Sequence, residues 1–169
     1  MRRKRHGYFS RDPAAPAPVR IAVNRRVAFS DVDPMGILWH GRYPVYFEQA
    51  SEELGRRCGM TYDDFMRENL RAPIIQYHID YFASPILGEK TCVVGRLIWN
   101  EGARMNIEYE LWKEDGTLAA AGCTVQMFVS DEGETLLASP EILDRCRDRW
   151  RKGEFRALQG DQGRNGYRK

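Results

Sequence analysis

One long amphipathic helix limits what this chain can fold into. Apolar residues recur at spacings of three and four, in the order Tyr43, Phe47, Ala50, Leu54 and Cys58. This spacing is typical of an α-helix with one buried face, and Gly59 is suited to end that helix in a left-handed conformation. Val45 and Tyr46 widen the apolar stripe. The helix therefore needs apolar cover over much of its circumference.

Four segments after Pro73 have the composition of strands that can supply this cover. They span residues 74–82, 90–99, 104–113 and 117–129. Within the third segment, Met105, Ile107 and Tyr109 alternate with polar residues, the pattern of a strand with one face on a core and one in water. The connections between the strands are short and contain glycine, so consecutive strands are predicted to be antiparallel neighbours.

The order of the elements predicts an α+β fold, a single curved antiparallel sheet wrapped around one long central helix. A first strand is expected over residues 21–29, a short helix capped by Thr61 over residues 62–69, and a last helix from Pro140 to about residue 150. The predicted strands carry more aromatic side chains than a lone monomer usually exposes, namely Trp99, Trp112, Tyr77 and Tyr81. This predicts a dimer or a higher oligomer.

Length and composition predict one domain. The chain has 169 residues, of which 43% are hydrophobic, and its formal net charge is only +2. We expect this domain to span residues 21–152. Residues 1–20 combine basic residues with a Pro/Ala run and are predicted to be a disordered arm, and residues 153–169 a flexible polar tail. The arm has no interleaved aromatic platform, so a solvated tail is favoured over a nucleic-acid contact.

The spacing of the cysteines and the length of the apolar segments bear on where the protein is located in the cell. The four cysteines are widely spaced, without a C-x-x-C pair, and suggest neither a zinc site nor a disulfide framework. No stretch approaches the roughly 20 apolar residues that a membrane helix needs, and the N-terminal residues lack the apolar core of a signal peptide. The sequence therefore predicts a soluble, cytoplasmic protein that does not insert into membranes.

Polar groups gather where the first strand gives way to the long helix. Asp31, Asp33 and His40 supply two carboxylates and an imidazole close to a helix N-terminus, whose unpaired N–H groups attract negative charge and can polarise a carbonyl. Pro34 breaks the strand after Asp33. The three side chains lack the further oxygen ligands of a calcium loop, so no metal site is predicted.

Residues 27–50 resemble the first motif of the 4-hydroxybenzoyl-CoA thioesterase and YbgC-like branch of the hotdog-fold acyl-CoA thioesterases. The resemblance is specific for the spacing Asp33-Pro34-x-Gly36-x-x-Trp39-His40-x-x-Tyr43 and for the continuation Phe47-Glu48-x-Ala50. It extends with less specificity over residues 21–150. It implies the hotdog fold, hydrolysis of an acyl-CoA thioester to a free acid and coenzyme A without a separate cofactor, and a homodimer or homotetramer.

The resemblance also implies roles for individual residues. Asp33 matches the catalytic carboxylate of the family, whereas Asp31 is interpreted as turn scaffolding. His40 is the second catalytic residue, its backbone N–H contacting the thioester oxygen. The implied substrate-binding residues are Gly36, Trp39, Tyr43, Glu48 and Arg104. Of these, Arg104 would pair with coenzyme A phosphates.

Several alternatives stay open at this point. Asp33 can act as the nucleophile or as the general base for water, or it can be an Asx-turn residue before proline. Phe29 stands where some YbgC-like members carry a tyrosine that orients the aspartate, which keeps open a non-catalytic hotdog protein that binds acyl-CoA or an acyl carrier protein. Trp39, Met60, Phe65 and Met66 suit an aromatic acyl group as well as an aliphatic one.

Overall fold

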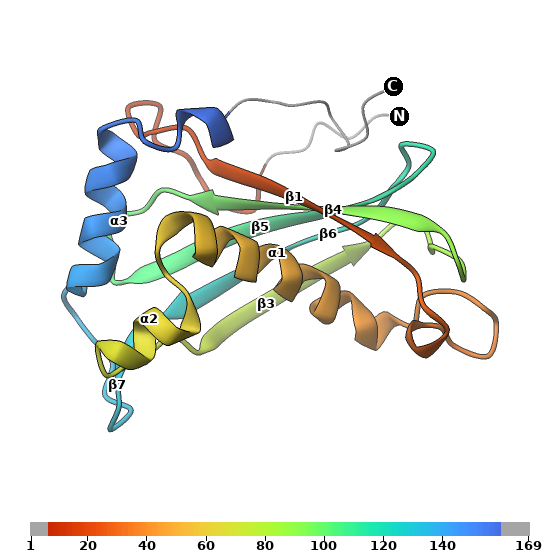
Figure 1. The fold of residues 1–169 in the computed structure, drawn as a ribbon, viewed down its shortest axis with the longest axis horizontal. Coiled ribbons are helices and arrows are strands. Elements are labelled where there is room, and N and C mark those ends of the chain that lie inside the picture. Colours follow the sequence, from red (N-terminus) through yellow and green to blue (C-terminus); the bar gives the residue numbers. More distant parts are fainter. Residues whose placement is uncertain (1–6, 160–169) are drawn as a thin grey trace.

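A computed structural model describes residues 7–159, and it shows one long helix lying across one face of a five-stranded antiparallel sheet (Figure 1). The helix is α1 (Tyr43–Cys58). The strands, in their order across the sheet, are β1 (Val19–Arg26), β4 (Lys90–Ile98), β5 (Arg104–Lys113), β6 (Leu118–Met127) and β3 (Ile74–Tyr81). The predicted α+β architecture is confirmed.

The smaller elements flank this frame. The first strand ends before Phe29, which lies in a 3-10 turn, and a second 3-10 turn leads directly into α1. The C-terminal helix lies at one end of the sheet (Figure 1). These elements are η1 (Phe29–Asp31), η2 (His40–Arg42), α2 (Tyr62–Arg67), β2 (Leu70–Arg71), β7 (Val129–Ser130), α3 (Glu141–Arg151) and η3 (Arg156–Leu158).

Two predicted helix boundaries are confirmed by their capping geometry. Gly59 ends α1 with a φ of 73°, the left-handed conformation that glycine adopts without a steric penalty. Thr61 begins α2: its hydroxyl accepts a hydrogen bond from the Asp64 N–H, and the Asp64 carboxylate accepts one from the Thr61 N–H at 2.9 Å. An aspartate thus completes the capping box in place of the usual Glu or Gln.

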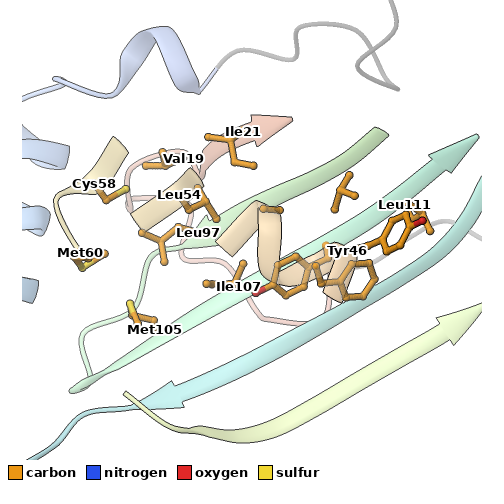
Figure 2. Close-up of a cluster of buried hydrophobic side chains, with 14 of the residues drawn as sticks. Val19, Ile21, Tyr46, Leu54, Cys58, Met60, Leu97, Met105, Ile107 and Leu111 are labelled. Atoms are coloured by element: carbon orange, nitrogen blue, oxygen red, sulfur yellow. The ribbon is translucent and has the colours of Figure 1, made fainter. Parts of the chain in front are cut away.

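The core forms between the apolar face of α1 and the sheet (Figure 2). Tyr46, Phe47, Ala50 and Leu54 are each at most 2% exposed. The Phe47 ring stacks on Tyr109 of β5, with ring centroids 4.8 Å apart. Burial of large apolar side chains contributes about 1.5 to 3 kcal/mol each, so this layer fixes how α1 lies on the sheet.

Residues 7–18 and the segment after α3, parts of the predicted arm and tail, contact the domain. In the N-terminal segment, residues 7–18, the Phe9 N–H and the Arg11 guanidinium donate to Glu108 of β5 at 3.2 and 2.9 Å. At the other end, Phe155 is 2% exposed and Trp150 of α3 donates to the Ala17 carbonyl at 2.9 Å. The strand β1 also starts two residues earlier than expected. Residues 1–6 and 160–169 of the predicted arm and tail lie outside the described residues.

Gly122 of β6 is a sensitive point of this packing, because a Cβ at this position would lie 2.3 Å from the His78 carbonyl oxygen and 2.9 Å from the Phe47 ring. We expect Gly122→Ala to lower the free energy of unfolding by about 1 to 3 kcal/mol, the usual cost of overpacking, as measured by urea unfolding. Gly102→Ala is the matched control, since its Cβ would meet nothing nearer than 3.5 Å. Equal stability of the two variants would contradict this packing.

Candidate active site

Asp33 lies in a tight turn between η1 and η2. Its N–H donates to the Ile37 carbonyl, and its carbonyl accepts from the Gly36 N–H, both at 2.9 Å. Gly36 has a φ of +75°, which explains why a glycine stands here. The Oδ1 atom of Asp33 accepts from the Met35 N–H at 2.8 Å, so the predicted Asx-turn geometry is present. Oδ2 receives no hydrogen bond within residues 7–159.

The connection between β3 and β4 holds this turn from the other side. The Leu38 N–H donates to the Pro85 carbonyl at 2.8 Å, and the Leu87 N–H donates to the Gly36 carbonyl at 3.0 Å. Ile37 and Ile86 form an isolated antiparallel bridge. Backbone contacts therefore fix the turn on both sides, and the Asp33 carboxylate is carried on a defined backbone rather than on a free loop.

The start of η2 presents backbone donors close in sequence to this carboxylate. The Trp39 N–H donates to the Asp31 carbonyl, but the His40 and Gly41 N–H groups have no backbone acceptor in the described part of the chain. The His40 imidazole is exposed and contacts the Trp39 ring, with centroids 5.2 Å apart, rather than Asp33. A Cβ on Gly41 would lie 2.4 Å from the Trp39 ring, so only glycine lets that ring pack here.

Asp31 is a buried structural carboxylate, 2% exposed. It accepts hydrogen bonds from Arg25 at 3.0 Å and from the Tyr46 hydroxyl at 2.9 Å. Burial by itself would raise the pKa of Asp31, but the hydrogen bonds from Tyr46, the Ala28 N–H and Arg25 outweigh it and hold the pKa below its usual range. Asp31 thus ties the end of β1 to α1, in agreement with its interpretation as scaffolding.

The other predicted site residues lie in different surroundings. Tyr43 is buried, and its ring packs edge-on against Tyr81, with ring centroids 4.9 Å apart. Burial raises the pKa of Tyr43 to about 12. Glu48 is half-buried on α1 and accepts a hydrogen bond from the Tyr62 hydroxyl. Arg104 is exposed at the start of β5. The structure does not bring Glu48 or Arg104 into contact with Asp33.

A cavity of about 440 Å³ lies between the C-terminal half of α1, α2 and the inner face of the sheet. Met60 and Phe65, two of the residues expected around the acyl group, line it, whereas Trp39 and Met66 do not. Gln126 and Ser51 are lining residues that the sequence did not single out. Only knowledge of the strand register could have placed Gln126 on the inner face.

Residues 7–159 contain no group of three or more His, Cys, Asp and Glu side chains arranged to hold a metal ion. No helix among these residues is long and apolar enough to cross a membrane. Hydrolysis without a cofactor stays a prediction.

One long helix across one face of an antiparallel sheet is the arrangement of the hotdog fold. The chain belongs to the thioesterase superfamily, whose family model matches residues 35–120. The expected family, hotdog fold and thioester hydrolase class are thereby confirmed. The matched range begins two residues after Asp33, so it does not assign a role to that residue.

Known proteins similar to this chain agree with the family. The acyl-CoA thioesterase YbgC of Haemophilus influenzae is 28% identical over 110 residues, 64% of this chain and 79% of YbgC. YneP of Bacillus subtilis is 25% identical over 107 residues, 63% of this chain and 77% of YneP. The solved structure of a DHNA-CoA thioesterase from Staphylococcus aureus has the same fold, with a TM-score of 0.68 and 22% identity over 82% of this chain and 90% of that one.

Exchanging the two aspartates for asparagine separates their roles by stability. Asp31→Asn leaves Arg25 without its partner, and we expect a loss of about 2 to 3 kcal/mol, less than for a fully buried pair because the Arg25 side chain is 20% exposed. Asp33→Asn keeps the acceptor of the Asx-turn and serves as the matched control, with stability close to that of the wild type. Urea unfolding measures both.

The pH dependence of the Asp31→Asn effect follows from the lowered pKa of Asp31. A carboxylate with a lowered pKa in the folded state stabilises the fold above its unfolded pKa of about 3.9, and this contribution is lost as the pH falls through the folded value. The stability difference between wild type and Asp31→Asn is therefore largest at neutral pH and shrinks below about pH 4. A difference that is independent of pH would contradict the assignment.

Proposed function

We propose that this protein hydrolyses an acyl-CoA thioester to a free acid and coenzyme A, with Asp33 supplying the reacting carboxylate. The observation that carries the proposal is a fixed carboxylate oxygen, Oδ2 of Asp33, followed by the N–H groups of His40 and Gly41. Among residues 7–159 neither this oxygen nor these N–H groups have a hydrogen-bond partner. Hydrolysis of a thioester needs both parts, a nucleophile or base and donors aimed at the developing oxyanion.

The two parts divide the chemistry between them. The Met35 N–H holds Oδ1 of Asp33, so Oδ2 attacks the carbonyl carbon or takes a proton from the attacking water. The N–H groups at the start of η2 carry partial positive charge and stabilise the oxyanion. Trp39 packs over Gly41 beside these donors. In this proposal His40 contributes its backbone N–H, because its ring contacts Trp39 instead of the carboxylate.

We expect Asp33→Asn to lower the rate of thiol release by about 10² to 10⁴-fold, the usual contribution of a general base, with binding of coenzyme A retained. Release of free thiol from a panel of acyl-CoA substrates is the measurement, and Asp131→Asn in the exposed turn after β7 is the control for the loss of a carboxylate. Wild-type rates of thiol release by the Asp33→Asn variant would show that Asp33 does not supply the reacting carboxylate.

A non-catalytic binding role has one observation in its favour. Phe29 is 84% exposed in η1 and has no hydroxyl to orient a neighbouring carboxylate. If the wild type binds coenzyme A or an acyl carrier protein but releases thiol from neither kind of thioester, this second candidate replaces the first.

The four cysteines are free thiols in the structure, which supports a cytosolic location for either function.

We further propose that the working enzyme is a homodimer joined through β3. In the described part of the sheet, β3 pairs only with β6, and its other edge is open. Its exposed apolar side chains include Ile75 at 51% and Tyr81 at 51% exposure. An open edge strand of this composition is suited to antiparallel pairing with a second copy of itself.

The direction of α1 gives this pairing a consequence for the site. Ring contacts between Tyr43 and Tyr81 and between Phe47 and Tyr77 show that α1 runs antiparallel to β3. The His40 carbonyl accepts from the Tyr81 hydroxyl at one end of β3. At the other end Ile74 pairs with Gln126, which lines the cavity. The two ends of β3 are about 23 Å apart, from the rise of a strand, and the turn lies near one end and the cavity near the other.

Antiparallel pairing of β3 with its copy brings opposite ends together. The Tyr81 end of the partner, with its Asp33 turn, then lies next to the Ile74 end of the first chain, with its cavity. Each active site of the proposed dimer combines the carboxylate of one subunit with the cavity of the other.

Mixing two inactive variants tests the shared site. Asp33→Asn removes the carboxylate, and Ser51→Phe fills the cavity while Tyr109 keeps its hydrogen bond to Thr124. If each site is shared, co-expression of the two variants restores thiol release, because every mixed dimer has one intact site.

The control is a chain that carries both substitutions, co-expressed with wild type. Its mixed dimers have no intact site if sites are shared, and one intact site if each chain acts alone. Thiol release per mixed dimer, purified with two different affinity tags, is the measurement. Failure of the first mixture to regain activity, with dimers present, would overturn the shared site.

A further inference from the structure

The 440 Å³ cavity has an open end on the side of α1 that faces β3. Ser51 lines the cavity one helical turn after Phe47, whose ring stacks on Tyr77 of β3. Tyr62 also lines it and is 56% exposed, so solvent reaches this end. In the proposed dimer, the open end is therefore turned toward the partner subunit and its Asp33 turn.

The strand order shows how deep each residue of the cavity lies. From the edge strand β3 inward, the sheet continues with β6, β5 and β4. The sheet residues that line the cavity are Gln126 on β6, Met105 and Ile107 on β5, and Leu97 on β4. Leu97 is thus the sheet residue of the cavity that lies farthest from β3 and from the proposed partner.

The core closes the cavity behind Leu97 (Figure 2). Leu97 is 4% exposed and pairs with Val19 of β1, which is fully buried and does not line the cavity. Leu54 of α1 reaches the same strand, since a Cβ on Gly95 of β4 would lie 3.2 Å from its Cδ1 atom. The helix and the sheet therefore meet here, and the cavity ends at Leu97.

The closed end has an apolar wall. Leu54, Met60, Phe65 and Leu97 line the cavity and are 2 to 6% exposed. Their side chains offer no hydrogen-bond donor, and Met60 offers only the weak acceptor of a thioether. Such a wall favours the burial of an alkyl chain, whereas a hydroxyl group there would lose its hydrogen bonds to water.

We propose that the acyl group is an aliphatic chain whose terminal methyl group meets Leu97, so that this side chain sets the chain length. The inference rests on the proposed function and names its substrate class. From β6 to β4 the cavity crosses two strand spacings, about 10 Å, which about eight methylene groups span. With the carbons next to the thioester at the open end, we expect an optimum at about eight to twelve carbons.

The test measures kcat/KM for coenzyme A thioesters of saturated straight-chain acids of about four to sixteen carbons, a range that brackets the expected optimum. For the wild type, kcat/KM rises by about fourfold per methylene group up to the optimum, because each added group is buried, and then falls. Leu97→Ala moves the optimum to chains about two carbons longer, since it opens space at the closed end. Leu97→Phe fills that space and moves the optimum to shorter chains.

Val93→Ala is the matched control, because Val93 is buried on the same face of β4 and does not line the cavity. It lowers stability without moving the optimum. Thermal unfolding checks that each variant is folded, and Leu97→Val gives a smaller shift in the same direction if Leu97→Ala does not fold. An optimum that stays in place in every folded Leu97 variant, or a wild type that prefers benzoyl-CoA to all straight-chain thioesters, overturns the proposal.

Binding of thioethers separates this inference from the proposed function. S-alkyl thioethers of coenzyme A, which cannot be hydrolysed, are titrated into the wild type and the folded Leu97 variants by calorimetry. An optimum of binding that moves with the size of residue 97 supports the role of Leu97 even if no thioester is hydrolysed. Hydrolysis without any dependence on chain length refutes the role of Leu97 and leaves the proposed function standing.

Discussion

The contact between α1 and the sheet is the constraint on which the rest of the structure depends. Phe47 stacks on Tyr109, and Gly95 and Gly122 leave room for Ala50 and Phe47. Because the helix lies this close to the strands, its direction relative to β3 is fixed along its whole length. The position of the Asp33 turn at one end and of the cavity at the other follows from this packing, since both are attached to α1.

Two aspartates close in sequence carry different tasks because their surroundings differ. Asp31 is surrounded by donors from three parts of the chain and is fully engaged in holding them together. Asp33 receives its hydrogen bonds at Oδ1 from its own turn, and its second oxygen accepts no hydrogen bond from residues 7–159. A carboxylate that held the fold and also changed its charge or bonding during turnover would destabilise its own support. The separation keeps the support of the turn independent of the proposed chemistry.

The sequence predicts those features that depend on short-range patterns. The helix stripe, the left-handed Gly59 and the capping box at Thr61 are local, and each is confirmed. The last predicted strand, over residues 117–129, is wrong in its extent: Phe128 is buried and donates to the Ala103 carbonyl, so β6 ends at Met127 and β7 pairs instead with β2. The prediction failed because tertiary packing against Phe65 turns the chain there.

The sequence pattern also did not predict that Gln126 faces the core, again because tertiary packing decides it. Alternation along a strand identifies its buried face only when the other face is in water. In β6 both faces are largely covered, and on the outer face Ala121 is 5% and Val125 4% exposed. The outer apolar residues therefore suggest the wrong face as the core, and only the pairing of Gln126 with Met105 corrects the assignment.

The antiparallel relation of α1 and β3 also decides what a single chain can do. One chain carries the Asp33 turn near the Tyr81 end of β3 and the cavity near the Ile74 end of this eight-residue strand. In the proposed dimer, antiparallel pairing of β3 with its copy combines the turn of one chain with the cavity of the other. Under the proposed pairing, residues around the cavity can change without disturbing the turn in the same chain, because the two lie on opposite ends of α1. The chemistry and the choice of acyl group are thereby separable within one small domain.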